Sequence, residues 1–200
     1  MSSPAFTRAE PDVRRQSLME ACARVLAQGG AGGVSVRAVA LAAGVSPGLV
    51  SHYFAGIDAL VAETYGHVEA QVSEAIDAAL DAAGPDPRAR LDAYVTASFA
   101  PPVASGELLA TWIAFWSLAR SRPEIARQHD EQYARFRTAL ETLLSACGIA
   151  PARLRHSAIA VTALVDGLWL ELSLSPGAFS AAEACEIARA QLDAIISTSR

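Results

Sequence analysis

Lysine is missing from this 200-residue chain, in which all sixteen basic residues are arginine. We interpret this usage as a result of genomic base composition rather than of function. Charged residues are sparse at 18% and aromatic residues make up 6%, whereas apolar residues reach 52%. This balance excludes an intrinsically disordered chain and predicts a globular protein with a proper core.

Signatures of the common enzyme classes are missing as well. We find no glycine-rich phosphate loop, no HExxH motif and no nucleophile elbow. The four histidines are scattered, without carboxylate partners at metal-binding spacing: His52, His67, His129 and His156. We therefore expect a protein that is not an enzyme and that needs neither a cofactor nor a metal ion.

Cysteine is rare, and no segment resembles a membrane span or a leader. Cys22, Cys147 and Cys185 are far apart and odd in number, as expected of reduced core residues. No apolar run approaches the roughly 18 residues that cross a bilayer. The N-terminus lacks a basic region followed by a hydrophobic one. We expect a cytoplasmic protein with no membrane partner.

The most informative stretch is residues 34–54, which reads as two short helices joined by a tight turn. Ser35 is suited to cap the first helix, and Gly44 stands where a left-handed residue would end it. Ser46 followed by Pro47 is a strong signal for the start of the second helix. An ordinary helical hairpin is the alternative, but this spacing is typical of a helix-turn-helix.

The second of these helices leaves a small polar face outward. Its apolar stripe consists of Leu49, Val50, Tyr53 and Phe54, so Pro47, Gly48, Ser51 and His52 face away from it. In a helix-turn-helix this face enters the major groove, and small residues allow the helix backbone to approach the bases. We expect these four residues to face bases in double-stranded DNA.

The stretch and its flanks resemble the N-terminal DNA-binding domain of TetR-family transcriptional regulators over residues 12–65. The resemblance is carried by Gly44-Val45-Ser46, by the run from Leu49 to Phe54, and by Asp58-Ala59-Leu60. It implies a three-helix DNA-binding domain over residues 1–57 and a helical ligand-binding and dimerisation domain over residues 58–200. Residues expected at the DNA backbone or at the start of the recognition helix are Arg14, Arg15, Arg37, Ser46 and Tyr53.

Charge is divided along the chain in a way that fits DNA contact at one end. Residues 1–54 contain five arginines and three carboxylates, a net charge of +2, so the net charge of −5 leaves −7 for the remainder. One departure from the family weakens the fit. The positions where TetR relatives commonly hold a basic phosphate-binding residue are Ala55 and Ile57.

The rest of the chain reads as helices separated by turns. Residues 1–12 form an expected loose arm, followed by a helix from Pro11 to Gln28 and a glycine-rich break at residues 29–33. Further helices are expected at 58–83, 88–99, 106–119, 123–147, 151–174 and 180–197. No strand alternation occurs, so we predict an all-α protein of about nine helices.

The body contains a group of aromatic residues that could form an effector site. Trp112, Phe115 and Trp116 recur at helical spacing, and Trp169 lies near Asp166 in a later apolar helix. Aromatic faces beside a carboxylate are what a quaternary ammonium ion requires. Aromatic residues at helical spacing are more often core, however, and Trp169 could equally pack at a dimer interface.

The last two helices are expected to form a homodimer, because both are too apolar to be half exposed. In TetR relatives the corresponding helices form a four-helix dimer bundle, which implies a pseudo-palindromic operator. The residues on which this prediction rests are Ala158, Val161, Leu164, Val165, Leu168 and Leu172 in one helix, and Ala184, Ile187, Ala188, Gln191, Leu192 and Ile195 in the other.

Three segments together are similar to BetI-type members of the TetR family, which are choline-responsive repressors: GLVSHYF at 48–54, WIAFW at 112–116 and DGLWL at 166–170. This resemblance implies a choline-like small-molecule effector. Two alternatives stay open: a TetR-like regulator of an uncharged apolar ligand such as a drug or acyl chain, or a TetR-fold ligand- or partner-binding protein that has lost DNA binding.

Overall fold

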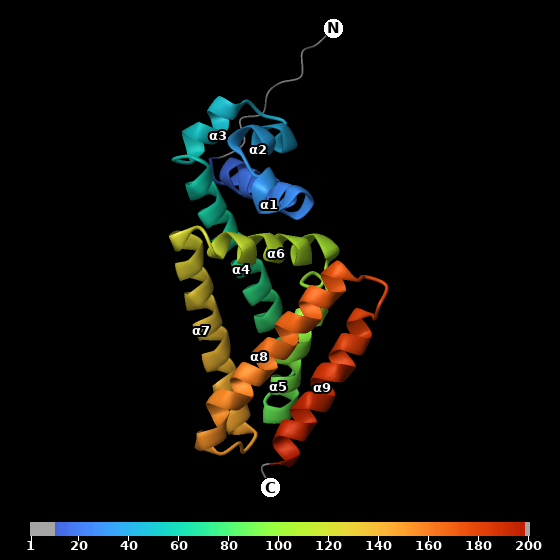
Figure 1. Cartoon of the computed structure of the whole chain (residues 1–200). Coiled ribbons are helices and arrows are strands. Elements are labelled where there is room, and N and C mark those ends of the chain that lie inside the picture. The colour runs from blue at the N-terminus through green and yellow to red at the C-terminus, as the bar shows by residue number, and fades with distance from the viewer. Residues whose placement is uncertain (1–10, 199–200) are drawn as a thin grey trace.

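The computed structural model describes residues 11–198 and confirms the all-α prediction. Within that range the chain forms nine α-helices and one short 3-10 helix, and no strand. Figure 1 shows a small head of three helices, α1 to α3, standing on an elongated body formed by the later helices. The expected N-terminal arm falls largely on residues 1–10, which lie outside the described part of the chain.

The head consists of α1 (Pro11–Gly33), α2 (Val36–Ala43) and α3 (Pro47–Tyr53). The hydroxyl oxygen of Ser35 accepts a hydrogen bond from the amide of Ala38 and so caps α2. Gly44 ends that helix with φ 66° and ψ 34°, a left-handed conformation that favours glycine. The predicted caps of the helix-turn-helix are thereby confirmed.

The first helix is longer than predicted. We expected an end at Gln28, but helical structure runs on to Gly33 and is interrupted at a single residue, Gly30, with φ 61° and ψ −168°. Because one glycine in the left-handed region turns the chain, the other glycines of residues 29–33 are not needed as a break. The run therefore forms a kink rather than a loop.

The body begins with α4 (Ile57–Ala82), which starts beside the head and runs down into the body (Figure 1). It is followed by α5 (Pro87–Thr96), the 3-10 helix η1 (Ala97–Phe99), α6 (Gly106–Ala119), α7 (Pro123–Ala146), α8 (Pro151–Leu174) and α9 (Ala181–Ser197). All of the helices predicted for the body are found, with ends within two residues except where η1 completes the fifth.

Head and body are joined by packed helices rather than by a linker. In Figure 1, α6 crosses directly beneath α1. The buried hydroxyl of Thr111 on α6 donates to the carbonyl oxygen of Glu107 in its own helix at 2.8 Å, and its oxygen lies 3.3 Å from the carbonyl oxygen of Ala23 on α1. On α4, Glu63 forms an ion pair with Arg15 of α1. The head therefore contacts the body through both α4 and α6.

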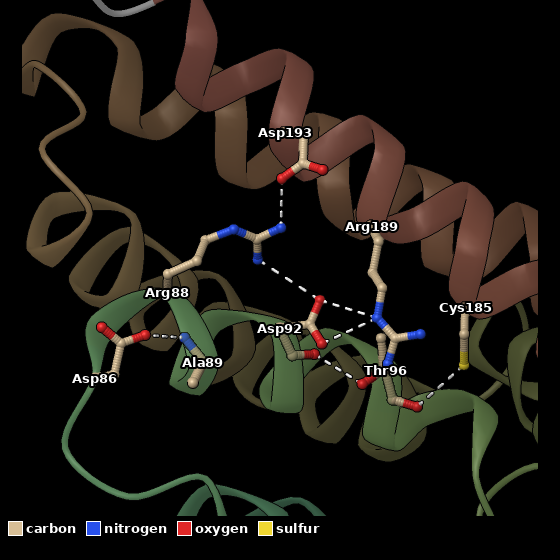
Figure 2. A network of polar contacts seen from close by, with 8 residues as sticks. All are labelled: Asp86, Arg88, Ala89, Asp92, Thr96, Cys185, Arg189 and Asp193. Atoms are coloured by element: carbon tan, nitrogen blue, oxygen red, sulfur yellow. Dashed lines mark hydrogen bonds and ion pairs between the residues drawn. The ribbon is translucent and has the colours of Figure 1, made fainter.

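An ion-pair ladder fixes the last helix to α5 (Figure 2). Arg88 of α5 pairs with Asp193 of α9 at 2.6 Å, and Arg189 of α9 pairs with Asp92 of α5 at 3.0 Å. Arg88 also lies 3.6 Å from Asp92, so the two arginines share one carboxylate. These contacts hold α9 in a defined position against the helix that lines one side of the body's interior.

The exposed faces of α8 and α9 differ from the face we expected at the dimer interface. Ala158, Val161 and Val165 are buried inside the subunit, as are Ala184, Ala188, Leu192 and Ile195, so these residues serve the subunit's own core. Of the predicted apolar residues, only Ile187 is exposed among those described, and it lies in α9 with Ala190 and Ala194, whereas the exposed stripe of α8 consists of residues outside the prediction: Ile159, Ala160, Ala163, Gly167, Leu170 and Leu174.

By length and composition alone, α8 could also cross a membrane, contrary to our prediction that no such run exists. An 18-residue window of it has a mean hydropathy of 1.5, and 33% of that window is buried inside the subunit. A single helix of this kind is weak evidence for a membrane span, since packed core helices pass the same test. The low burial does mean that α8 has apolar surface to cover.

Candidate DNA-binding surface and effector cavity

The outward face of α3 is arranged as the sequence predicted. Pro47, Gly48, Ser51 and His52 are all exposed, whereas Val50 is buried beneath them. Ser46 caps the helix by accepting a hydrogen bond from the amide of Leu49 at 3.3 Å. The segment GVSPG at 44–48 matches the G-x-S-x-G pattern of a nucleophile elbow. In that motif the serine lies between a strand and a helix, whereas this segment joins two helices, so Ser46 is a helix cap and not a nucleophile.

The basic residues around this face have different roles. Arg37 of α2 is exposed and Arg14 of α1 is half-buried, so both are accessible on the head. Arg15, which we expected at a phosphate, instead forms a two-pronged ion pair with Glu63 of α4, one prong being 2.8 Å long. It therefore joins α1 to α4, and its assignment as a phosphate ligand is corrected.

Two more contacts complete the environment of Arg15. Its guanidinium donates to the backbone carbonyl of Tyr53 at 2.9 Å and lies 4.6 Å from the ring centroid of Phe54. Tyr53 itself is half-buried, with its ring edge against His52 at 5.3 Å. Since one side chain holds the end of α3 against α1 and α4, Arg15 sets the orientation of the recognition helix.

The body encloses an inner cavity of about 300 Å³ between α4, α5, α6, α7 and α8. This volume is at the lower end of the range of ligand pockets, about 300–1,000 Å³. Five aromatic side chains and three carboxylates line it: Tyr94, Trp112, Tyr133, Phe136 and Trp169, with Glu69, Asp77 and Asp166. Only one guanidinium is present, that of Arg135, so three carboxylates against one cation give a formal charge of −2.

The aromatic side chains of the cavity are held by contacts with one another and with the backbone. The rings of Trp112 and Trp169 lie 6.3 Å apart, and the indole N–H of Trp169 donates to the carbonyl oxygen of Ser98 at 2.8 Å. Tyr94 stacks on Phe136 at 4.9 Å. These rings are therefore fixed in place before any ligand binds, which reduces the entropic cost of binding.

Asp166 is a half-buried charge of the cavity. Its Oδ1 accepts a hydrogen bond from the hydroxyl of Tyr133 at 2.9 Å. Burial raises the pKa of Asp166 to about 6, although this hydrogen bond and the charge of Arg137 act in the opposite direction. A cation beside Asp166 would favour the ionised carboxylate, because the opposite charge offsets the poor solvation that raises the pKa.

A second hollow, the outer groove, lies on the other side of this hydrogen bond. It has a volume of about 490 Å³ and is lined by residues of α6, α7 and α8: Trp116, Ala119, Arg120, Ala126, His129, Asp130, Tyr133, Asp166, Gly167 and Leu170. Tyr133 and Asp166 line both hollows. Burial raises the pKa of Tyr133, and Asp166 acts in the same direction, whereas the indole of Trp116 acts in the opposite direction.

Comparison with known proteins identifies the family. Residues 87–197 match the family described as BetI-type transcriptional repressor, C-terminal, and residues 18–64 match bacterial regulatory proteins, tetR family. The chain belongs to the TetR family. Its body is of the BetI type. The matched families and relatives are transcriptional regulators with a DNA-binding helix-turn-helix, and are not enzymes.

Relatives of this TetR-family chain match it over most of its length. The HTH-type transcriptional regulator BetI of Burkholderia thailandensis is 35% identical over 187 residues, which cover 92% of this chain and 94% of the relative. A chain from Pseudomonas aeruginosa PAO1, named as a transcriptional regulator, superimposes with a TM-score of 0.86 at 36% identity and covers 98% of this chain and 99% of its own.

A regulator from Saccharomonospora viridis, solved in complex with choline, shares the fold at 18% identity with a TM-score of 0.78. The match covers 91% of this chain and 96% of that chain.

The structure separates the five residues that the sequence grouped as the effector site of this TetR-family regulator. Trp112, Trp169 and Asp166 line the inner cavity, whereas Trp116 lines only the outer groove. Phe115 lines neither hollow, since it is fully buried with its ring 4.9 Å from that of Tyr65. Its prediction as a ligand contact is therefore corrected to a core role.

Three aromatic residues of the inner cavity were missed by the sequence analysis. Tyr133 and Phe136 are spaced i, i+3 on α7, a signal that could have been used. Tyr94 is the sole aromatic residue of α5, so nothing in its surroundings distinguishes it from a core residue. The same holds for Glu69 and Asp77, which look like ordinary solvated charges on α4.

Proposed function

We propose that this TetR-family protein is a homodimeric repressor that binds a pseudo-palindromic operator and is released from it by a small quaternary ammonium cation such as choline. The observation that carries the effector assignment is the inner cavity, where five aromatic side chains accompany the half-buried carboxylate of Asp166. We place the protein in the cytoplasm, where chromosomal DNA is accessible.

The chemistry of the cavity supports a cation as the ligand. Aromatic faces attract a quaternary ammonium ion by cation–π interaction, which is worth about 2 kcal/mol or more when the ion is desolvated. Asp166 supplies a counter-charge within the cavity, and Glu69 and Asp77 add negative potential. An anionic ligand such as a fatty acid would meet a formal charge of −2. The choline bound by the S. viridis protein of the same fold agrees with this choice.

The head is suited to read DNA with α3 in the major groove. Its exposed residues Pro47, Gly48, Ser51 and His52 are assigned to the base-facing surface, and Arg14 and Arg37 to phosphates. The helix α4 begins without a side-chain cap, so its first amides are free to bind a phosphate in place of the missing basic residues at Ala55 and Ile57.

Dimerisation is assigned to the exposed stripes of α8 and α9. Leu174 is 66% exposed and Ile187 is 45% exposed, and small residues between the larger ones allow helices to approach closely. A two-fold axis through this surface would bury both stripes and place two heads at successive half-sites. This agrees with the low burial of α8 inside its own subunit.

Release of DNA follows from the way in which the cavity is connected to the head. The cavity is lined by α4 and α6, and these helices also contact the head through Glu63 and Thr111. A ligand that draws the lining residues together shifts the population toward dimers whose heads no longer fit the operator. The shift is limited by the difference in ligand affinity between the two states.

Tryptophan fluorescence of the purified dimer tests the effector assignment. Choline should cause saturable quenching, whereas its uncharged tert-butyl isostere, 3,3-dimethylbutan-1-ol, should cause far less. Asp166→Asn should weaken the response to choline and leave that to the isostere unchanged. Equal responses to both compounds in the wild-type dimer would establish an apolar pocket, and silence from both would refute an effector of this class.

A further inference from the structure

Two hydrogen-bond donors in the lining of the inner cavity have no acceptor among the described residues. The hydroxyl of Tyr65 donates to Oε1 of Gln132, so the side-chain amide of Gln132 keeps its Nε2 for another acceptor, and no described residue supplies one. The indole N–H of Trp112 is buried and likewise has no partner among the described residues. The cavity therefore contains donors that its own lining does not use.

Both donors belong to side chains that contact the same tyrosine. Tyr65 of α4 is buried, and its ring lies edge-on to that of Trp112 of α6 at 5.3 Å, while its hydroxyl is bonded to Gln132 of α7. We call Gln132 and Trp112 the donor corner. It is a polar part of a lining that is otherwise supplied with aromatic faces and carboxylates.

A donor without an acceptor is unfavourable in a site that is closed off from water, because it loses its hydrogen bonds to water and gains none in return. The other tryptophan of the cavity shows the satisfied state, since the N–H of Trp169 donates to the carbonyl oxygen of Ser98. A ligand oxygen at the donor corner would supply the missing acceptor. An alkyl group there would leave the donors unpaired, and such ligands are disfavoured by sites built for a hydrogen bond.

We propose that Gln132 and Trp112 bind an acceptor oxygen of the effector, so that the cavity selects quaternary ammonium ions carrying a hydroxyl or carbonyl group over plain alkylammonium ions. The inference rests on the proposed function for the cationic part of the ligand. The aromatic faces and Asp166 bind the ammonium group, which both kinds of ion share. The donor corner distinguishes between the two kinds.

Choline and n-propyltrimethylammonium are the probes that test this selection. They carry the same charge and differ in that a methyl group replaces the hydroxyl group. Calorimetric titration of the full-length dimer with each chloride salt gives the ratio of the two affinities. In the wild type, choline should bind about two- to tenfold more tightly, the range of one hydrogen bond. Without that bond, the additional methyl group would favour the propyl ion through the hydrophobic effect.

Replacing the amide tests the first donor. Gln132→Met keeps the length of the side chain and should lower the affinity ratio to about one or below. Because it leaves the Tyr65 hydroxyl unpaired, the double variant Tyr65→Phe/Gln132→Met, which removes both partners, is titrated as well and should give the same ratio. Gln128→Met is the control. Gln128 lies one turn earlier on α7, donates to the carbonyl oxygen of Ala62 at 3.2 Å and is not part of the lining, so the ratio should stay at the wild-type value.

The two tryptophans of the cavity give a matched pair for the second donor. Trp112→Phe and Trp169→Phe each remove one indole from the aromatic lining, so both should weaken the binding of both ions. Only Trp112→Phe removes an unpaired N–H, so only this variant should lower the preference for choline. Circular dichroism establishes that each variant is folded before it is titrated.

Equal affinities of the two ions in the wild type, or tighter binding of the propyl ion, would overturn the inference. A preference for choline that persists in both Gln132→Met and Trp112→Phe would also overturn it, because the hydroxyl would then bond elsewhere. Loss of the preference in one of these variants supports the inference and assigns the oxygen to that donor. Failure of both ions to bind the wild type would instead refute the proposed function, so the two failures are distinguishable.

Discussion

The hydroxyl of Tyr133 hydrogen-bonds to Oδ1 of Asp166 at 2.9 Å, and these two side chains form the wall shared by the inner cavity and the outer groove. Burial raises the pKa of this carboxyl to about 6. A cationic effector requires the ionised form, so protons and effector compete for Asp166. The contact therefore connects effector binding to pH.

We expect the affinity for choline to fall as the pH drops through about 6, by at most about tenfold per pH unit because one proton is bound. Above pH 7 the affinity should be constant. Calorimetric titration between pH 5 and 8 measures this dependence. In Asp166→Asn the affinity should be low and free of a step near pH 6. A wild-type affinity that is constant from pH 5 to 8 would remove Asp166 from the site.

The raised pKa of Asp166 also predicts how the stability of the fold depends on pH, and this dependence is opposite to that of the affinity for choline. An aspartate in an unfolded chain has a pKa of about 3.9, so between that value and about 6 the folded state binds the proton more tightly. The stabilisation from protonated Asp166 is full below about pH 4 and is lost as the pH rises to 6. Relative to Asp166→Asn, the wild type should lose stability to urea across this window, and a gain instead would contradict the assignment.

Gly48 separates DNA contact from folding. A Cβ at this position would meet only the hydroxyl of Ser46 at 3.9 Å, so the fold does not require glycine there. Gly48→Ala should preserve or raise stability by up to about 1 kcal/mol and still weaken operator binding, because the added methyl group faces the bases. Gly66→Ala in α4, also with free space around it, is the control and should leave DNA affinity unchanged. Unchanged affinity in Gly48→Ala would argue against close approach of α3.

Arg15 and Arg37 should behave differently when each is replaced by alanine. Arg15→Ala removes the ion pair with Glu63 and the bond to the Tyr53 carbonyl, and should cost about 1–2 kcal/mol, since the pair is partly exposed. Arg37→Ala should leave stability unchanged and lower the slope of log affinity against log salt by about 1. Thermal unfolding and salt-dependent DNA binding measure the two effects. Equal stability of both variants would contradict the structural role of Arg15.

The exposed stripe of α8 gives a direct test of the dimer. Ala163→Glu places a charge in the middle of that stripe and should convert dimer to monomer in analytical ultracentrifugation, with loss of operator binding. Leu41→Glu is a control at a residue of the head that is 84% exposed, and it should stay dimeric. A dimeric Ala163→Glu variant would place the interface elsewhere.

The elements of the fold could be predicted from local signals. Ser35, Gly44 and Ser46-Pro47 mark helix ends by capping chemistry that acts within a few residues, and the structure confirms each of them. The exposed face of α3 followed from its apolar periodicity alone. The position of the kink at Gly30 could not be predicted, because four of the five residues 29–33 are glycine and the non-helical conformation of one of them is enough to turn the chain.

The site was harder to predict, because it depends on which face of each helix meets another helix. On α6, Trp112 and Trp116 are neighbours at i, i+4, yet they line different hollows because Asp166 and Tyr133 lie between those hollows. Arg15 looked like a free cation until Glu63, distant in sequence, was placed beside it. On α8 the buried and exposed stripes are both apolar, so periodicity could not tell core from interface.

The central claim is that one molecule binds an operator and releases it when a cation enters the cavity. Fluorescence anisotropy of a DNA fragment selected by the dimer from a random library, measured with and without choline, tests it most directly. We expect that choline lowers the DNA affinity of the wild type, that Asp166→Asn binds DNA but responds far more weakly to choline, and that log affinity falls linearly with log salt. Absence of DNA binding with that salt dependence, or the same response to choline in the wild type and in Asp166→Asn, would contradict it.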